Sequence, residues 1–476
     1  MIVTSKKFRT ATLFSGAGGL DTGFVQTGNF KMMLANDVLS SPAESYCANY
    51  SHKILDVLDF NSKVKEPVYI VGDISKIDFR PLGSVDCMVG GPPCQDFSVA
   101  RGTSAERKGV HVERGKLYSH FIRALIATNP KVFAFENVPG LMSANGGATF
   151  GFIIEDFSKL NLRWDEVKKI TGNKISEAGH NYSIIFSKIV DSSKIGVPQK
   201  RNRLIIIGVR SDLIDWVTET ELRQRTENIL LGRQSILSRY PLTAMEAFTG
   251  LALPDLQEKY IEVIKQYKPI VEDAVTDQAK SWRDKIWKNL TFDVVKDYLF
   301  INNIKLDQRN ILEIEEAFEE HVSVLKELGY YHKNLEGRNF EDGSNNLLGE
   351  SEAVAERMRM IPPDENSTFV DGTKWQVKSR GMSHIYRRLH PLKPAYTVLA
   401  YGGGGTWSYH YERERGKLTN RERARLQTFP DEFRFKGNVS EIRAQIGEAV
   451  PTLLGNKIAK TVEIILNSVN ERNDVP

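Results

Sequence analysis

In the first 210 residues, short β-rich runs alternate with amphipathic helical patterns, and the most unusual residues come directly after these runs. This alternation is typical of a layered α/β domain. Ligands of open α/β sheets bind beyond the carboxyl ends of the strands, so we expect one ligand site along that edge. The features that follow predicted strands are the glycine-rich loop Phe14–Leu20, Asp37, Asp73, Cys94 and Glu136.

The predicted strands are Thr10–Phe14, Lys31–Ala35, Val68–Val71, Val85–Val89, Lys131–Phe135, Tyr182–Val190 and Leu204–Val209. The last two are joined by a short loop without a helical pattern, which predicts an antiparallel pair at the sheet edge. Leu117, Phe121 and Leu125 are spaced for one face of a helix that ends before Pro130.

The character of the sequence changes after Arg210. The following residues, to about position 370, are charged and mostly helical in pattern, and the chain then becomes basic and aromatic before four consecutive glycines. A length of 476 residues also predicts two or three domains. We expect a catalytic and cofactor-binding domain at 1–214, a partly helical insert at 215–395, and a segment at 396–476 that returns to the first domain.

The composition excludes several classes of protein. No apolar run reaches eighteen residues, so no membrane span is expected, and the N-terminus lacks the pattern of a secretory signal. Cys47, Cys87 and Cys94 form no close cluster with histidines, which favours a reducing cytoplasm and predicts no metal site. The formal net charge of +4 favours a polyanionic partner without proving one.

Gly16, Gly18 and Gly19 lie where a strand turns into a helix, and they would allow a ligand to approach the backbone closely. Helix-entry glycines are also common without a ligand. Asp21 occupies the place of the third glycine of a dinucleotide fingerprint, and no Lys-Ser/Thr follows as in a phosphate-binding loop. Asp37 could bind ribose hydroxyls and Asp73 an adenine amino group, although either alone could be a solvated strand end. Together they favour an adenosine ligand without a pyrophosphate.

Cys94 lies in GGPPCQDFS, where two prolines and a polar, glycine-flanked setting favour a presented nucleophile over an inert core thiol. The basic segment from Asp96 to Lys116 could close over an anionic substrate or be a plain solvated loop. Glu136 ends an apolar strand, so we expect partial desolvation and a raised pKa, unless it caps a helix or forms a structural ion pair. Gln199, Arg201 and Arg203 alternate into a strand, which would place all three on one face.

The sequence contains, in this order, the motifs FSGAGG, GPPCQ, ENV, QKRNR, RERARLQTFP and GEAVP. This ordered set resembles the motifs of cytosine-C5 DNA methyltransferases. The resemblance covers roughly residues 10–210 and 385–465 and leaves the middle third unmatched. It implies a class I methyltransferase fold: a Rossmann-like mixed sheet with helices on both faces and an inserted target-recognition domain.

By this resemblance, the protein transfers a methyl group from S-adenosylmethionine to C5 of cytosine in a specific double-stranded DNA sequence. Cys94 would attack C6 of a base extruded from the duplex, and Glu136 would protonate N3. Arg203 would hold O2, with Arg201 and Gln199 supporting the pocket.

The resemblance also implies which residues line the cofactor and DNA sites. The implied cofactor residues are Phe14, Ala17, Gly19, Asp37, Asp73, Ile74, Pro92, Leu117, Ala449 and Val450. The expected DNA-binding residues are Ser98, Arg101, Lys378, Arg380, Arg387 and Arg388. The helical part of the insert could equally be an elaboration that never touches DNA.

Two positions depart from the family pattern. Glu448 stands where asparagine is usual, and we predict that its carboxylate turns away from the cofactor carboxylate or binds the ammonium group. Val38 stands where an aromatic residue often stacks on adenine.

We expect a cytoplasmic monomer of a restriction-modification system, whose cognate endonuclease acts on the same DNA site without binding stably. The pairing with a nuclease is a habit of the family. The nearest rival is a tRNA cytosine-C5 methyltransferase, which the large insert disfavours. A dinucleotide-dependent oxidoreductase is disfavoured by the missing third glycine. A catalytically idle DNA-binding protein is disfavoured by the presence of Cys94, Glu136 and Arg203 together.

Overall fold

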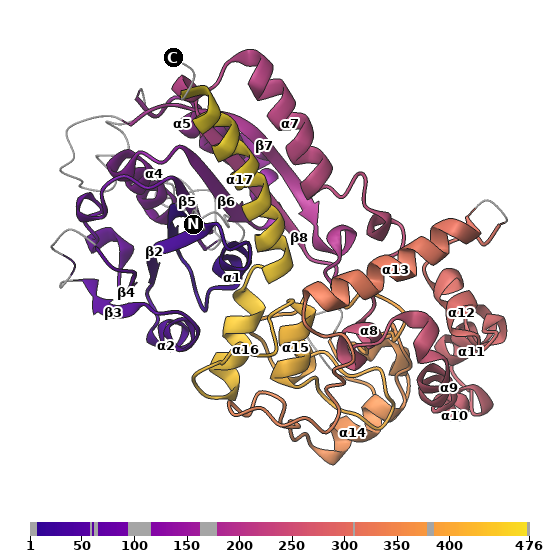
Figure 1. The fold of residues 1–476 in the computed structure, drawn as a ribbon. Helices are drawn as coiled ribbons and strands as arrows, with labels where there is room; N and C mark the ends of the chain where they lie inside the picture. The colour runs from indigo at the N-terminus through magenta and orange to yellow at the C-terminus, as the bar shows by residue number, and fades with distance from the viewer. Residues whose placement is uncertain are drawn as a thin grey trace. The chain divides into compact units, whose positions relative to one another are not determined.

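The computed structural model describes residues 7–57, 60, 65–93, 116–161, 179–307, 310–377 and 385–473. The chain divides into two compact units, each built from separate stretches of sequence (Figure 1). Unit 1 comprises residues 1–191, 202–234 and 452–476, and unit 2 comprises 192–201 and 235–451. In the described residues, no helix is both long and apolar enough to cross a membrane.

Unit 1 contains an eight-stranded sheet of order β3-β4-β2-β1-β5-β6-β8-β7. The strands from β3 to β6 are parallel, whereas β8 pairs antiparallel with both β6 and the edge strand β7. Their bounds are β1 Phe8–Leu13, β2 Phe30–Asp37, β3 Lys53–Asp56, β4 Val68–Val71, β5 Cys87–Gly90, β6 Val132–Asn137, β7 Tyr182–Asp191 and β8 Asn202–Arg210.

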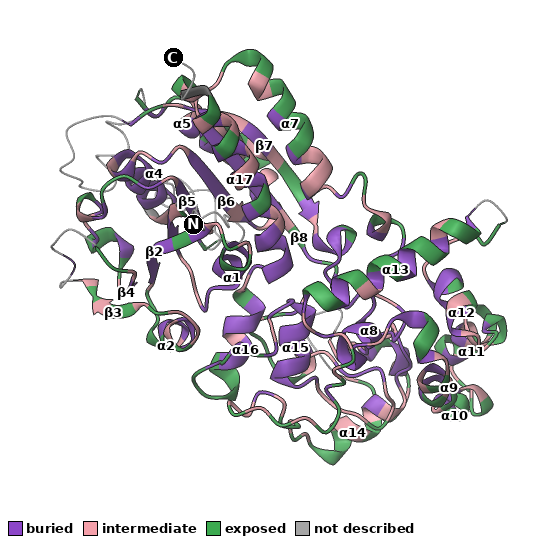
Figure 2. Cartoon of the chain, in the orientation of Figure 1, coloured by how far each residue is buried: buried purple, intermediate pink, exposed green. Residues whose placement is uncertain are grey.

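The inner strands of the sheet are largely buried, whereas the edge strand β3 is mostly exposed (Figure 2). Side chains of the inner strands alternate between two apolar faces. On one face, Phe133 and Phe135 of β6 pack with Phe121 of α4 and Phe157 of α5. Helix α17 contacts β6 and also packs on α1 and α7. The helices are α1 Gly19–Gln26, α2 Ser40–Asn49, α4 Lys116–Thr128, α5 Ala148–Ser158, α7 Trp216–Leu230 and α17 Thr452–Asn473.

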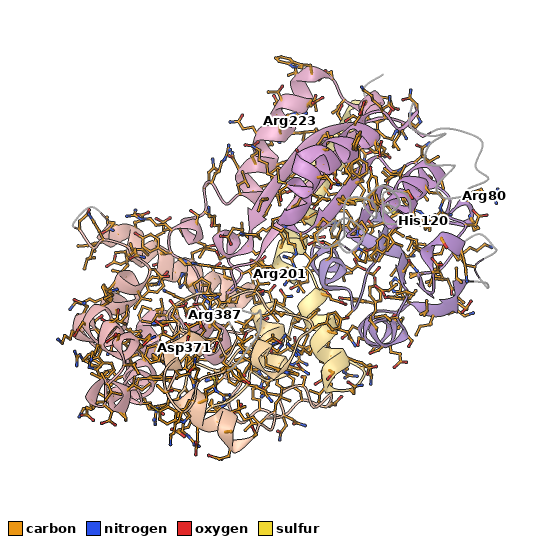
Figure 3. All side chains as sticks on the ribbon, turned by 180° about the vertical axis from the view of Figure 1, so that it is seen from behind. Arg80, His120, Arg201, Arg223, Asp371 and Arg387 are labelled. Carbon is orange, nitrogen blue, oxygen red and sulfur yellow. The ribbon has the colours of Figure 1, made fainter. Side chains whose placement is uncertain are left out.

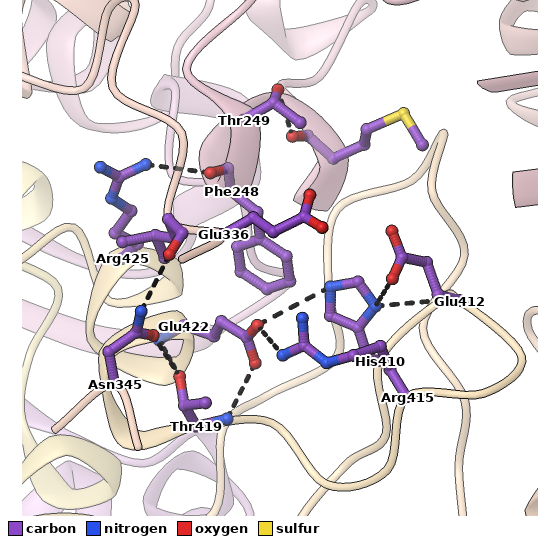
Figure 4. A network of polar contacts seen from close by, with 12 residues as sticks. Phe248, Thr249, Glu336, Asn345, His410, Glu412, Arg415, Thr419, Glu422 and Arg425 are labelled. Atoms are coloured by element: carbon purple, nitrogen blue, oxygen red, sulfur yellow. Dashed lines mark hydrogen bonds and ion pairs between the residues drawn. The ribbon is translucent and has the colours of Figure 1, made fainter. Parts of the chain in front are cut away.

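Unit 2 is mainly helical, with long irregular connections. Its helices are α8 Ala244–Thr249, α9 Gln257–Lys265, α10 Lys268–Glu272, α11 Asp277–Lys285, α12 Val294–Ile301, α13 Ile311–Glu327, α14 Glu352–Arg359, α15 Asn420–Leu426 and α16 Val439–Glu448. Buried polar groups hold the start of α15 in place. Glu422 accepts the backbone N–H of Thr419 at 2.8 Å and forms a 2.6 Å ion pair with Arg415, beside the buried ring of His410 (Figure 4).

The predicted strands and the antiparallel pair at the sheet edge are confirmed, and the short edge strand β3 was not predicted. The division of the chain differs from the expected one in three places, and the first is that residues 192–201 belong to unit 2 rather than to the first domain. Helix α7 belongs to unit 1 with the sheet, and only α17, rather than all of 396–476, belongs to unit 1 at the C-terminal end. Residues 396–451 instead form part of unit 2.

The packing of α1 against α17 requires two glycines. A β-carbon on Gly23 would lie 2.2 Å from the backbone nitrogen of Asn456, and one on Gly455 would lie 2.6 Å from the carbonyl oxygen of Leu20. Backbone cannot yield to such contacts as a flexible side chain can, so the two helices must move apart if either glycine is replaced.

We therefore expect Gly23→Ala to lower the free energy of unfolding by about 1–3 kcal/mol, as overpacking typically does. The measurement is urea denaturation followed by circular dichroism. Gly151→Ala is the matched control, because a β-carbon on this α5 glycine meets nothing within 4 Å. Equal stability of the two variants would contradict the prediction.

Candidate active site

The carboxyl ends of five neighbouring parallel strands gather most of the predicted site residues. Across the sheet, β4 leads to Asp73, β2 ends at Asp37, β1 leads to the glycine-rich loop, β5 leads to Pro92, and β6 carries Glu136. Because β8 runs antiparallel, its first residues, including Arg203, lie at the same edge. The expected ligand edge of the sheet is therefore built entirely within unit 1.

The glycine-rich loop is tied to the end of β2. Asp37 accepts the N–H of Gly16 at 3.0 Å and that of Leu39 at 3.2 Å, and Ser15 donates its N–H to the carbonyl of Asn36 at 2.8 Å. Burial raises the pKa of the Asp37 carboxyl, although these N–H donors oppose the shift. Gly16 has φ +53°, and a β-carbon there would meet nothing within 4 Å. The Asp37 carboxylate is thus held by hydrogen bonds beside the backbone of Gly16, where there is space for a ligand.

The cap of the turn after β4 is an exposed carboxylate. Asp73 caps the 3₁₀ turn η2 (Ile74–Lys76) by accepting the N–H of Ser75 at 2.9 Å, and this bond lowers the Asp73 pKa. Ile74 is buried, and Val38 next to Asp37 is 64% exposed. An exposed carboxylate and apolar side chains at neighbouring strand ends suit a nucleoside with hydroxyl and amino groups.

The end of β5 is held by β6. The side-chain amide of Asn137 donates to the carbonyl of Pro92 at 3.0 Å, and a β-carbon on Gly91 would lie 2.6 Å from Oε2 of Glu136. The Glu136 carboxylate therefore packs directly on the chain that leads to Cys94. Cys94 itself lies outside the described residues, as do Ser98 and Arg101.

Glu136 and Arg203 form an ion pair at the sheet edge. Nε of Arg203 lies 2.8 Å from Oε1 of Glu136, and each side chain is only 14% exposed. The β6–β8 register, which pairs Asn137 with Leu204, brings the two residues together. Glu136 is therefore partly desolvated, as expected, but it also forms the ion pair that the sequence left open as the alternative, and a neighbouring cation favours the ionised carboxylate.

Gln199 and Arg201 do not continue the β8 face that carries Arg203. Strand β8 begins at Asn202, and both residues lie in unit 2 with almost no exposed surface (Figure 3 labels Arg201). Gln199 donates to the carbonyl of Leu426 at 2.9 Å, and Arg201 donates to the carbonyls of Val398 and Gly447 at 3.2 and 2.9 Å. The period-two argument fails here because the strand is shorter than the motif.

The expected DNA-binding set is only partly described. Arg388 is 0% exposed and its guanidinium donates to main-chain carbonyls including those of Ile361 and His410, so it does not belong to a surface set. Arg387 is half-buried, with its guanidinium carbon 2.9 Å from the ring centroid of Tyr396. Lys378 and Arg380 lie outside the described residues.

The remaining cofactor candidates divide between the units. Phe14, Ala17, Gly19 and Leu117 belong to unit 1 with the other strand-end residues, whereas Ala449 and Val450 belong to unit 2 after helix α16. Glu448 ends α16 and is exposed.

Sequence reasoning missed the buried carboxyl of Asp21 and the role of Asn137. Asp21 lies in the first turn of α1, completely buried. Burial raises its pKa to about 7, and the hydroxyls of Thr12 and Tyr46 oppose this shift only in part. Asn137 directly follows Glu136, and successive side chains of a strand point to opposite sides. This position could have indicated that Asn137 has a role different from that of Glu136.

Comparisons with known proteins identify the family of the chain. Residues 8–463 match the model of the family described as C-5 cytosine-specific DNA methylase. DNA (cytosine-5-)-methyltransferase M.ApeKI of Aeropyrum pernix is 49% identical over 97% of this chain and all of the relative. Type II methyltransferase M.NgoFVII of Neisseria gonorrhoeae is 30% identical over 99% of this chain and 91% of the relative.

A solved structure supports the fold. The crystal structure of a prophage-encoded protein of E. coli, described as a DNA modification methyltransferase, superposes with a TM-score of 0.53 at 20% identity. The match covers 97% of this chain and all of that one.

Asp21 predicts a pH dependence of stability. Its carboxyl has a pKa raised by burial to about 7 in the folded chain, against an unperturbed value of 3.8, so the folded state binds its proton more tightly. Its contribution to the free energy of unfolding is complete below about pH 4 and is lost as pH rises to about 7. Asp21→Asn should therefore be more stable than the wild type at about pH 8 and nearly equal at about pH 4. Urea denaturation at both pH values tests this, and a constant difference between the variants would contradict it.

Proposed function

The chain belongs to the C-5 cytosine-specific DNA methylase family and is a DNA (cytosine-5-)-methyltransferase, and we propose that it acts on duplex DNA through a covalent bond from Cys94. The observation that carries the proposal is the Glu136–Arg203 ion pair packed against Gly91, three residues before Cys94. An acid and a cation at the strand edge from which the chain continues toward Cys94 suit addition to a pyrimidine ring.

In the proposed reaction, the thiolate of Cys94 adds to C6 of a cytosine extruded from the helix. Glu136 holds a proton at N3, which lets the ring accept the electron pair and makes C5 nucleophilic. Arg203 keeps Glu136 in place and binds the cytosine O2. After C5 is methylated, loss of its proton to a base and departure of the Cys94 thiolate restore the aromatic ring.

The residues at the strand ends fit S-adenosylmethionine, which would supply an electrophilic methyl group. Asp37 is fixed beside the loop by the Gly16 N–H and would bind the ribose hydroxyls. The space around Gly16 leaves room for a ligand against the backbone, and exposed Asp73 would accept from the adenine amino group. Val38, with 64% of its surface exposed, would cover adenine with less area than an aromatic residue.

We propose that the DNA partner is a short specific sequence and that the enzyme belongs to a restriction-modification pair as a soluble, monomeric cytoplasmic protein. The relative M.NgoFVII is a type II methyltransferase, the class from which this pairing is inferred. A tRNA substrate is the alternative outcome. Labelled-cofactor assays on duplex DNA and on tRNA distinguish the two, and bisulfite sequencing of plasmid from an expressing host gives the target sequence.

The covalent step is tested with duplex DNA containing 5-fluorocytosine. The fluorine cannot leave as the C5 proton does, so the wild type should form a denaturation-resistant adduct that Cys94→Ala abolishes. Cys47→Ala is the matched control and should retain the adduct, because burial raises the pKa of that thiol to about 11. An adduct in Cys94→Ala, or none in the wild type with bound cofactor, would overturn the proposed chemistry.

Helix α13 of the insert is not expected to contact DNA. Its exposed face carries Glu315, Glu316, Glu319 and Glu320, and carboxylates are repelled by phosphates. Replacing all four with Gln should leave the Kd for duplex DNA within about twofold or tighten it slightly at fixed salt. Binding weakened about tenfold or more would place α13 on the DNA.

A further inference from the structure

Helix α4 carries a buried guanidinium that binds the backbone of the segment after β4. Arg123 donates to the carbonyl oxygens of Ile74 at 2.6 Å and Ile77 at 2.5 Å, and its guanidinium carbon lies 4.9 Å from the ring centroid of Phe79. The two carbonyls stand at the beginning of turn η2 and just after its end. Arg123 therefore closes the turn whose cap is Asp73.

The charge of Arg123 is satisfied mainly by these carbonyls. In the described part of the chain, no carboxylate lies within ion-pair distance of it, and Asp73 and Asp78 attract it only from further away. Burial lowers the Arg123 pKa to about 10, so the group stays protonated at neutral pH. A buried cation holds its acceptors firmly, because any movement of the carbonyls would leave the charge without a partner.

His120, one turn earlier on α4, orients this guanidinium (Figure 3 labels His120). Its Nδ1 accepts the Nε–H of Arg123 at 3.2 Å, so Nδ1 carries no proton. Burial and the neighbouring Arg123 charge lower the His120 pKa to about 4, while Asp73 acts in the opposite direction. The ring is therefore neutral at working pH, and it fixes the plane of the guanidinium without adding a second cation.

Apolar packing alone would not require an arginine at this place. Ile74, Ile77 and Phe79 are buried in the same core cluster as Phe121 and Ile122 of α4. A methionine at 123 would fill much of the same space but would leave two carbonyls without donors. Apolar contacts are non-directional, whereas the guanidinium fork fixes where the backbone of η2 lies relative to α4.

We propose that Arg123, oriented by His120, is a positioning residue for the adenosine end of the methyl donor. It fixes Asp73 and Ile74 of the η2 turn relative to Leu117 in the first turn of α4. The inference rests on the proposed function, in which these three residues bind the cofactor. It concerns cofactor affinity and assigns neither residue a part in proton transfer.

The test compares Arg123→Lys and Arg123→Met with the wild type. Lysine keeps the charge but cannot donate to both carbonyls from a planar fork, so both variants should raise the KM for S-adenosylmethionine, Met by about tenfold and Lys by less. The kcat at saturating cofactor and the Kd for duplex DNA should stay within about twofold. Arg80→Met is the matched control, because exposed Arg80 lies in the same connecting segment and pairs with the side chain of Asp78.

His120 supplies a second readout. His120→Asn keeps an oxygen acceptor for the Arg123 Nε–H and should change the KM less than His120→Leu, which has none. Titration of His120 should not change the wild-type KM for S-adenosylmethionine between about pH 6 and 9, because the ring is neutral throughout this range. A step in that range that His120→Asn removes would overturn the positioning role.

Equilibrium dialysis with labelled cofactor separates the two possible failures. If the wild type binds no S-adenosylmethionine, the proposed function fails. If the wild type binds it and Arg123→Met binds it equally well, or if kcat falls while KM is unchanged, the positioning role is overturned. If Arg123→Met binds DNA poorly and its circular dichroism spectrum shows that it is unfolded, the test uses Arg123→Lys, which keeps the charge. Its cofactor Kd, KM and kcat are then compared with those of the wild type in the same way.

Discussion

The antiparallel pairing of β8 with β6 is the constraint on which the active site depends. In a purely parallel sheet, the first residue of every strand lies at the edge opposite the ligands, and Arg203 would be far from Glu136. Because β8 is reversed, its beginning meets the end of β6, and the Asn137–Leu204 register sets the two charged groups 2.8 Å apart. One change of strand direction thus places a cation beside the Glu136 carboxylate.

The same strand end also holds the chain that leads to Cys94. Successive residues of β6 point to opposite sides, so Glu136 packs on Gly91 while Asn137 binds the Pro92 carbonyl. A β-carbon on Gly91 would lie 2.6 Å from the Glu136 carboxylate, so a larger residue there would displace that carboxylate. The ENV motif therefore helps to position the backbone of Gly91 and Pro92, with which the GPPCQ motif begins.

Much of this edge could be predicted from the sequence, because strand ends are marked by abrupt changes from apolar to special residues. The pattern indicated the strands, their reversed last pair and the gathering of Asp37, Asp73 and Glu136. It could not reveal the surroundings of arginines, because the acceptors come from distant parts of the chain. Arg388 binds carbonyls 22 to 30 residues away, and Arg201 binds carbonyls about 200 residues away or more, so both appear in the sequence as ordinary basic residues.

Interior arginines change how the basic character of the chain should be interpreted. Arg123 in unit 1 and Arg201, Arg388 and Arg423 in unit 2 all direct their guanidinium groups at main-chain carbonyls. A charge used in this way orders irregular backbone that has no strand or helix partner, and it is not available to a phosphate. The number of phosphates neutralised on binding, which sets the salt dependence of DNA affinity, must therefore be smaller than the arginine content suggests.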